Sequence, residues 1–201
     1  MIHRRLAVTV LVTSLWIVAC KKEPPPPPEP TGPTAEELAA QRRADSIAEA
    51  QRIADSVAQA EAAARAQAEQ RMAEARATLE EMVFFDYDKS DIRSDAETVL
   101  RRKVEILRAS PAVELLIAGH ADERGSTEYN LALGQRRAES VRQFFADFGL
   151  DQNRFDITSF GEERPLVNEH NEAAWARNRR AEFEITAGAD QINPVMNRPD
   201  R

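Results

Sequence analysis

The stretch that most restricts the fold is residues 34–82, which contain neither glycine nor proline. Alanine, glutamate, glutamine and arginine make up most of it, and all four have high intrinsic helix propensity. Thr34 and Glu37 have the spacing of a capping box, in which two side chains satisfy backbone N–H groups at a helix start. We therefore predict an Ala-rich helix over 34–82, ~72 Å long at ~1.5 Å per residue.

A repeat of ten residues lies within this helix. Segments 41–50 and 51–60 are identical at seven of ten positions. Ten is not the seven-residue period of a coiled coil, and large apolar side chains are few, so the pattern does not specify strong helix pairing. We predict a solvated spacer helix, with a partner-binding helix as the alternative.

The N-terminus has the pattern of a secretory signal peptide. Arg4 and Arg5 precede the apolar segment 6–19, which only three hydroxyl residues interrupt. These fourteen residues are too few to cross a bilayer, because a spanning helix needs ~20 apolar residues. We predict that residues 1–19 are a cleaved signal peptide and that the protein is exported.

The only cysteine, Cys20, directly follows Ile17–Ala19. This sequence resembles the bacterial lipobox, and the resemblance implies cleavage before Cys20 and lipidation of that residue. Two or more acyl chains anchor a protein stably in a membrane. Lys21 in place of aspartate implies export to the outer membrane, with the protein on its periplasmic side. The alternatives are a free cysteine after an ordinary signal peptide and an uncleaved anchor.

Residues 20–33 contain seven of the eleven prolines. A run such as Pro24–Pro28 favours a polyproline II helix, which is semi-rigid and extends ~3.1 Å per residue. We predict a Pro-rich linker between the lipidated N-terminus and the long helix. The alternative is a ligand for a proline-binding domain.

Composition excludes several classes of protein. One cysteine cannot form an intramolecular disulfide or a multi-cysteine metal site, and three histidines leave little for a histidine-rich site. A formal net charge of −7 argues against a nucleic-acid partner, because phosphate favours a basic surface. His120 stands beside Asp122 and Glu123, as a general base or metal ligand would, but no nucleophile motif or second ligand accompanies it. We expect no metal, no cofactor and no enzymatic activity.

Residues 83–188 have the pattern of a compact domain of the α+β class. Strict alternation of apolar and polar residues predicts strands, and apolar residues three or four apart predict helices that pack by one side. The expected elements, in order, are a strand at 83–85, a helix capped by Ser94 or Asp95, a strand at 113–118, a helix at 127–148 with Leu133, Val141, Phe144 and Phe148 facing inward, a strand at 155–159, a short helix near Ala173 and a strand at 181–186. Residues 189–201 are expected to form a disordered tail.

Five motifs follow one another in this domain, at Phe85–Ile92, Gly119–Gly125, Tyr129–Ala138, Ser159–Pro165 and Asn178–Arg180. Together they resemble the signature of the OmpA-like peptidoglycan-binding domain, over about residues 83–187. The resemblance implies a β-α-β-α-β-β mixed sheet with helices packed on one face. We expect the last motif to brace a loop and the last strand, with ligand contact as the alternative.

The resemblance also implies a ligand. A peptidoglycan stem peptide with meso-diaminopimelate presents an ammonium and a carboxylate at one end of its third residue. Asp122 suits the ammonium, and Arg137 can bind the carboxylate through two parallel hydrogen bonds. The ligand contacts of the family map onto these two residues and onto Tyr87, Asp88, Asn130 and Leu133. We expect Asp122→Ala or Arg137→Ala to abolish binding and leave the fold intact.

The alternatives for these two residues are ordinary ones. Asp122 would bridge groups within its own loop, and Arg137 would be a solvated arginine on a helix surface, as charged helix residues usually are.

The resemblance implies an outer-membrane lipoprotein that tethers the outer membrane to peptidoglycan. Family lipoproteins of this kind also engage TolB and other Tol proteins in envelope integrity and cell division, and we expect the same partners here. The alternative is a structural lipoprotein of the envelope or of a secretion apparatus without a Tol link. A wall amidase or glycosidase is a third alternative, but its catalytic motif is missing.

Overall fold

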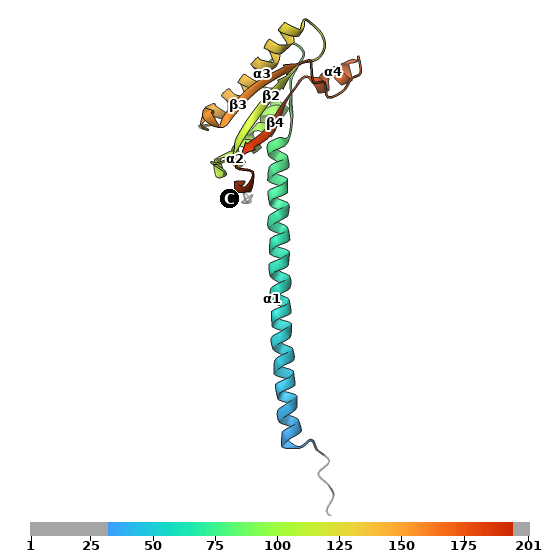
Figure 1. Cartoon of the computed structure of the whole chain (residues 1–201), viewed down its shortest axis with the longest axis vertical. Coiled ribbons are helices and arrows are strands. Elements are labelled where there is room, and N and C mark those ends of the chain that lie inside the picture. The colour runs from blue at the N-terminus through green and yellow to red at the C-terminus, as the bar shows by residue number, and fades with distance from the viewer. Residues whose placement is uncertain (1–31, 195–201) are drawn as a thin grey trace, which may run out of the picture. The chain divides into compact units, whose positions relative to one another are not determined.

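The computed structural model describes residues 32–194. In chain order its elements are α1 (Ala35–Glu80), β1 (Val83–Phe84), α2 (Ser94–Ala109), β2 (Glu114–His120), α3 (Thr127–Asp147), the 3₁₀ helix η1 (Gln152–Arg154), β3 (Phe155–Gly161), α4 (Glu172–Asn178), β4 (Arg180–Ala187) and the 3₁₀ helix η2 (Ala189–Gln191), as Figure 1 shows. The predicted signal peptide 1–19, the lipidation site Cys20 and the linker as far as residue 31 lie outside the described residues.

The start of α1 has the predicted capping box. The backbone N–H of Thr34 donates to Glu37 Oε2 at 2.7 Å, and the N–H of Glu37 donates to Thr34 Oγ1 at 3.3 Å. The hydrogen bond from the Thr34 backbone lowers the pKa of Glu37. The predicted long helix is confirmed, and its last helical residue is Glu80.

The last two turns of α1 contribute to the core of the domain that follows. Ala75 and Leu79 lie one turn apart on the same side of the helix, and both are buried. Lys103 of α2 is also fully buried, and its Nζ donates to the carbonyls of Thr78 at 2.8 Å and Leu79 at 2.7 Å. Because α1 has no basic residue in its own last turn, Lys103 supplies the cation at this helix C-terminus. The core therefore begins earlier than the predicted domain boundary.

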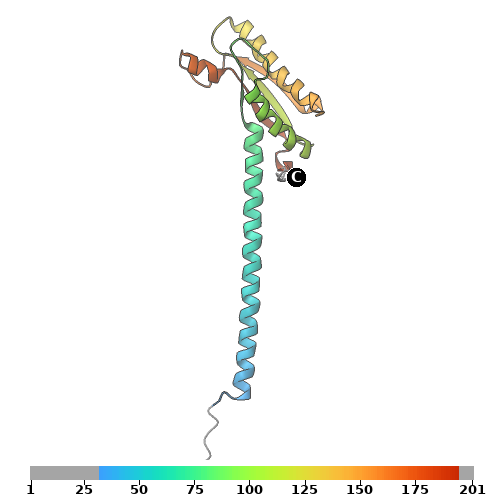
Figure 2. The ribbon, with the colours of Figure 1, turned by 180° about the vertical axis from the view of Figure 1, so that it is seen from behind.

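The sheet is mixed, with the strand order β1-β4-β2-β3. Strands β2 and β3 run parallel, whereas β4 is antiparallel to both β1 and β2. Parallel neighbours need a crossover connection, and α3 provides it between β2 and β3. Helices α2 and α3 pack on one face of the sheet, in front of the strands in Figure 2. These findings confirm the predicted α+β class and the predicted sheet.

Helix α3 buries two of the four residues that were predicted to face inward, Leu133 and Val141. Val141 and Phe145 are fully buried, whereas Phe144 and Phe148, which were expected to face inward, are only half-buried and stack with 4.9 Å between ring centroids. Residues four apart share one side of a helix, so the buried stripe continues from Phe145 through Val141 to Arg137. Arg137 lies on this buried side of the helix, between Leu133 and Val141, and has no exposed surface.

The predicted cap of α2 is wrong. The residue at the N-cap position is Arg93, and its side chain makes no capping hydrogen bond. Asp95 accepts hydrogen bonds from Arg93 Nε and from the N–H of its neighbour Ala96, so it pairs locally instead of capping the helix.

The segment after β4 also differs from the prediction. Residues 189–194, which were expected to belong to a disordered tail, follow β4 with the turn η2 and then contact the domain. Ile192 is only 4% exposed and belongs to the core, and the N–H of Asn193 donates to Ser110 Oγ at 2.8 Å. Burial of Ile192 contributes ~1.5 to 3 kcal/mol to holding this segment against the domain.

Strand β2 and helix α3 approach each other at two glycines. A Cβ atom on Gly119 would lie 1.8 Å from the carbonyl oxygen of Gly134, and one on Gly134 would lie 2.3 Å from Ser159 Oγ. Only hydrogen can occupy these positions. The close contact brings the first half of α3 against the end of β2, where the loop with Asp122 begins.

Between residues 32 and 194, none of the helices combines the length and the apolar character needed to cross a membrane.

Candidate ligand-binding site

The six residues predicted to bind ligand line one pocket of the structure. They come from three segments: Tyr87 and Asp88 follow β1, Asp122 follows β2, and Asn130, Leu133 and Arg137 lie on α3. The same pocket is lined by three residues of the motifs that were not predicted as ligand contacts, Arg124, Gly125 and Tyr129. The fold therefore gathers the predicted residues at the ends of β1 and β2 and the start of α3.

Arg137 is held rigidly at this pocket. Each of its guanidinium nitrogens donates to a backbone carbonyl: Nε to Lys89 at 2.9 Å, Nη1 to His120 at 2.6 Å and Nη2 to Asp86 at 3.1 Å. A guanidinium has five N–H groups, so two remain beyond these three bonds. Burial, followed by the nearby charge of Arg179, lowers the pKa of Arg137 to about 10, which leaves it protonated at neutral pH.

The carboxylate of Asp122 is almost fully buried and heavily hydrogen-bonded. Its Oδ1 accepts from the backbone N–H of Arg124 at 3.1 Å and from Arg124 Nε at 3.0 Å. Its Oδ2 accepts from Arg124 Nη2 at 2.7 Å and from Arg179 Nη1 at 3.1 Å. Burial raises the pKa of Asp122, but the hydrogen bonds from Arg124 and Arg179 outweigh burial and lower it overall. Asp122 is therefore ionised at neutral pH.

The rim of the pocket contains a second carboxylate, that of Asp88. This residue has a φ of 56°, the one positive value among the described residues other than glycine. Aspartate tolerates this left-handed conformation better than most residues. The hydroxyl of Tyr129 donates to Asp88 Oδ1, and this hydrogen bond raises the pKa of Tyr129. Tyr87 and Tyr129 are both exposed, so the rim is aromatic and acidic.

Asn130 and Leu133 form the buried side of the pocket on α3. Asn130 Nδ2 donates to Glu162 Oε2 at 2.5 Å and to the carbonyl of Arg124 at 3.3 Å. Gly125, next in the same loop, has a φ of 116°, which glycine adopts at no steric cost. Asn130 thus ties the loop after β2 to the loop after β3.

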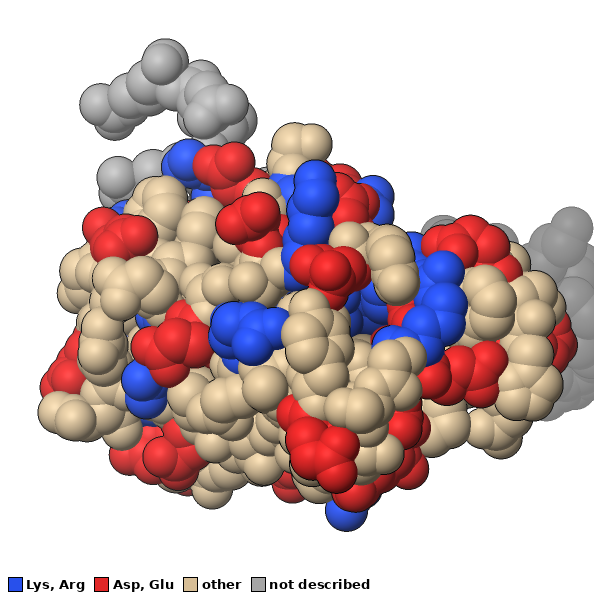
Figure 3. Space-filling view, turned by 90° about the horizontal axis from the view of Figure 1, so that it is seen from above, with Lys and Arg blue, Asp and Glu red and all other residues tan. Residues whose placement is uncertain are grey.

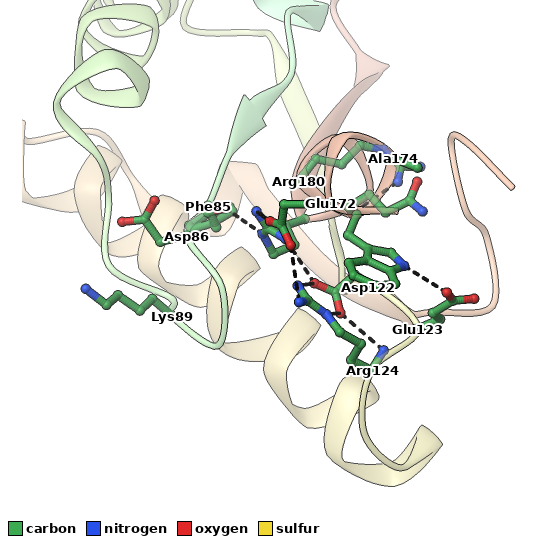
Figure 4. A network of polar contacts seen from close by, with 12 residues as sticks. Phe85, Asp86, Lys89, Asp122, Glu123, Arg124, Glu172, Ala174 and Arg180 are labelled. Carbon is green, nitrogen blue, oxygen red and sulfur yellow. Dashed lines mark hydrogen bonds and ion pairs between the residues drawn. The ribbon is translucent and has the colours of Figure 1, made fainter. Parts of the chain in front are cut away.

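Two arginines bond Asp122 at the site: Arg124, which the sequence analysis did not predict as a site residue, and Arg179, which it expected to brace a loop and the last strand. Arg124 lies two residues after Asp122, and this spacing in a loop was the available signal. Arg179 is only 7% exposed and bonds Phe85, Asp122 and Glu172, so it links three segments at the site. Figure 4 shows Asp122 and Arg124 paired, with Glu172 beside them.

The two neighbours of Arg179 make the contacts of a brace. The side chain of Asn178 accepts from the N–H groups of Leu166 and Val167 and donates to the carbonyl of Val167. Arg180 donates to the carbonyl of Arg164 and to Glu182 on the same strand. Both therefore hold the loop after β3 against β4, and neither lines the pocket.

His120 is buried behind the pocket and does not line it. Within the described part of the chain neither ring nitrogen has a hydrogen-bond partner, and Nε2 lies 3.6 Å from Glu182 Oε2. Burial, followed by the charge of Arg180, lowers the pKa of His120 to about 4, so the ring is neutral at neutral pH. Residues 32–194 contain no group of three or more side chains placed to hold a metal ion.

The pocket brings together charges of both signs. Two carboxylates, those of Asp88 and Asp122, and two guanidinium groups, those of Arg124 and Arg137, line it. On the face of the molecule seen from above, basic and acidic side chains are likewise interspersed (Figure 3). Such a site suits a ligand with both an ammonium and a carboxylate better than it suits a polyanion.

Comparison with known proteins shows which family the chain resembles. The model of the OmpA family matches residues 84–179. The peptidoglycan-associated lipoprotein of Haemophilus influenzae is 46% identical over 99 residues, which cover 49% of this chain and 65% of that protein. The protein of the same name from Brucella melitensis is 48% identical over 99 residues, which cover 49% of this chain and 59% of that protein. The match thus spans about three fifths of these curated relatives.

A solved structure agrees as well. The crystal structure of the peptidoglycan-associated lipoprotein from Burkholderia pseudomallei superposes with a TM-score of 0.51 at 39% identity, over 52% of this chain and 88% of that chain. The resemblance predicted from the five motifs is confirmed: the chain belongs to the OmpA family.

Proposed function

We propose that this protein is an outer-membrane lipoprotein that tethers the outer membrane to peptidoglycan by non-covalent binding of diaminopimelate stem peptides. The observation that carries the proposal is that a buried carboxylate, Asp122, and a buried guanidinium, Arg137, line the same pocket. A carboxylate and a guanidinium held at fixed positions can bind, respectively, the ammonium and the carboxylate at one end of the same amino acid. The relatives' shared name, peptidoglycan-associated lipoprotein, supports the same ligand.

The surroundings of Arg137 favour binding of a carboxylate. Because three backbone carbonyls fix the guanidinium, a ligand does not have to order this side chain. Pre-ordered groups lose less conformational entropy on binding. Each charge-assisted hydrogen bond to such a group contributes ~1.5 to 3 kcal/mol when it is shielded from water.

The remaining predicted residues complete the recognition. The exposed ring of Tyr87 and the carboxylate of Asp88 stand at the rim, where the rest of a stem peptide would pass. Leu133 and Asn130 supply an apolar and a polar contact on the buried side. The hydroxyl of Tyr129 is hydrogen-bonded to Asp88, but this bond raises the pKa of Tyr129 and so does not activate it as a nucleophile; the proposed role is non-enzymatic.

Tethering also requires the other parts of the chain. A lipid on Cys20 would hold the protein in the outer membrane on its periplasmic side, and the linker and α1 would separate that anchor from the domain. A wall polymer close to the membrane presents many stem peptides at high local concentration, so modest affinity per site is sufficient.

We further propose that the protein acts as the Pal component of a Tol-Pal system, with TolB among its partners, in envelope integrity and cell division. The relatives are named peptidoglycan-associated lipoproteins, and the link to Tol proteins is what the family resemblance implies. A pull-down from the native organism with the full lipidated chain distinguishes it from a structural lipoprotein without Tol linkage. Recovery of TolB supports the Tol-Pal role, and recovery of peptidoglycan alone contradicts it.

The binding proposal is tested by co-sedimentation with purified sacculi. Wild-type protein is expected to sediment with diaminopimelate-type sacculi and to bind lysine-type sacculi at least about tenfold more weakly, because lysine lacks the carboxylate for Arg137. Asp122→Asn keeps the shape of the side chain and removes its charge, and it should weaken binding by at least about tenfold. Equal binding of both types of sacculi, or full binding by Asp122→Asn, would contradict the proposal.

The arginine needs a different variant from the one that the sequence suggested. Arg137→Ala would leave the carbonyls of Asp86, Lys89 and His120 without their donor in a buried region, so it would damage the fold as well as the site. Arg137→Lys keeps the charge and removes the planar fork, and it should lose the preference for diaminopimelate-type sacculi. Asp156→Asn, at an exposed position outside the pocket, is the matched control for Asp122→Asn and should bind normally.

A further inference from the structure

The carboxylate of Asp122 has no capacity left for a ligand. It accepts four hydrogen bonds, three from Arg124 and one from Arg179. An ionised carboxylate has about four lone-pair sites. A ligand ammonium therefore cannot be added to this carboxylate and must replace one of its present donors.

Only one of these donors can leave easily. Arg179 is 7% exposed and also bonds the carbonyl of Phe85 and the carboxylate of Glu172, so its departure would break a buried network. The backbone N–H of Arg124 is fixed by the loop. The Arg124 side chain, in contrast, is 28% exposed and lines the pocket, so it is the donor in contact with an arriving ligand.

The Arg124 guanidinium keeps partners when it releases Asp122. It lies over the ring of Tyr87 at 4.0 Å and over the ring of Trp175 at 4.3 Å. Its Nη1 also bonds Glu172 Oε2 at 3.2 Å, and Glu172 is 64% exposed. A short movement away from Asp122 thus leaves the cation paired with one carboxylate and two aromatic faces, which keeps the cost of displacement low.

We propose that Arg124 is a specificity-determining residue: its guanidinium occupies, at Asp122, the position that the ligand's ammonium takes on binding. A ligand ammonium therefore binds Asp122 only by displacing the Arg124 guanidinium. The inference rests on the proposed function, because it concerns the same pocket. An internal cation of this kind lowers the affinity for a ligand whose ammonium must displace it, and it does not compete with a ligand that has no ammonium. Such a ligand meets Arg137 and leaves Arg124 in place.

Arg124→Met tests this inference, because methionine keeps an unbranched stem between the two rings and removes the cation. Isothermal titration calorimetry with the full chain would use a muramyl tripeptide ending in meso-diaminopimelate and the same peptide with its terminal amine acetylated. The variant should bind the free amine about three- to tenfold more tightly than wild type, as expected for removal of one competing ion pair. It should bind the acetylated peptide no more tightly, because the pocket has become more negative.

A second measurement follows the displaced group directly. In the ¹⁵N NMR spectrum of the wild type, the Nε–H signal of Arg124 should shift on addition of the free-amine peptide and stay in place with the acetylated one. Arg124→Lys keeps a cation and should retain wild-type selectivity. Arg101→Met, on α2 and outside the pocket, removes one positive charge elsewhere and should change neither affinity.

The outcomes separate this inference from the proposed function. If wild type binds the free-amine peptide and Arg124→Met binds it equally or more weakly, Arg124 is a ligand contact or a structural residue, and the inference is wrong while the function stands. If neither protein binds it, both are wrong. Tighter binding by Arg124→Met that is confined to the free-amine peptide supports the inference. Should Arg124→Met fail to fold by circular dichroism, the Nε–H shift in the wild type decides.

Discussion

The charged residues of α1 and those of the following domain have the same chemistry in opposite surroundings. In α1, ion pairs such as Arg52–Glu49 and Arg65–Glu61 join residues three or four positions apart, and their side chains are at least 60% exposed. In the domain, Lys103, Arg137 and Arg179 are nearly or fully buried and bond backbone and side-chain groups far along the sequence. Exposed pairs at this spacing contribute ~0.3 to 0.5 kcal/mol, whereas breaking a buried network costs ~3 to 5 kcal/mol.

The difference shows where each region gets its stability. Helix α1 depends on the intrinsic propensity of alanine, glutamate and arginine, which one substitution other than glycine or proline changes little. The domain depends on close packing and on buried polar groups that must all find partners. Substitutions of similar size should therefore have very different effects in the two regions, and three predictions rank them from the largest effect to the smallest.

The largest effect is expected at the contact between β2 and α3. In Gly119→Ala the new Cβ would overlap the carbonyl oxygen of Gly134, which is backbone and cannot move aside. Overpacking a tight interior costs ~1 to 3 kcal/mol, and the severity of this overlap places the expected loss at or above ~3 kcal/mol. Urea denaturation followed by near-ultraviolet circular dichroism measures it. Gly32→Ala, at a position with open space, is the control, and equal stability of the two variants would contradict the packing that the structure shows.

The next effect depends on pH and concerns Lys103. Burial lowers the pKa of this residue from 10.5 to about 7, and the charges of Glu81 and Glu80 offset burial only in part. Below pH 7 the folded and unfolded states both carry the proton, so the contribution is constant. Between about pH 7 and 10.5 the folded state has lost the proton that the unfolded state keeps, so stability rises with pH.

Lys103→Met removes this dependence. Between about pH 6.5 and about pH 9.5, the free energy of unfolding of wild type should rise by ~1 to 3 kcal/mol relative to the variant. Urea denaturation of both proteins at the two pH values gives the difference. Parallel changes in wild type and variant would show that Lys103 keeps an ordinary pKa in the folded protein.

The smallest effect is expected in α1. Arg65→Ala removes an exposed pair with Glu61 and places the best helix former at that position. The two changes nearly cancel, so helix content measured by far-ultraviolet circular dichroism should be unchanged. The free energy of unfolding should stay within ~0.5 kcal/mol of wild type. A loss above ~1 kcal/mol would mean that α1 has a tertiary partner at this position.

The sequence was sufficient for the features that depend on local pattern. The capping box at Thr34 and Glu37, the long helix and the alternation of β3 and β4 follow from backbone propensity and side-chain period, which act over a few residues. The motifs also named six residues of the pocket correctly as neighbours, although they lie in three separate segments.

Other features depend on which groups meet across the fold. Arg137 lies in line with Val141 and Phe145 on α3, and its burial depends on close packing of that helix against the sheet, which the Gly119–Gly134 contact allows. The occupation of Asp122 by Arg124 and Arg179 likewise requires the loop after β2 to meet the residue that precedes β4. A one-dimensional pattern can show that an aspartate and an arginine are present at a site. Their hydrogen-bonding capacity is set by every donor and acceptor within about 3 Å, and only the packed chain brings these together.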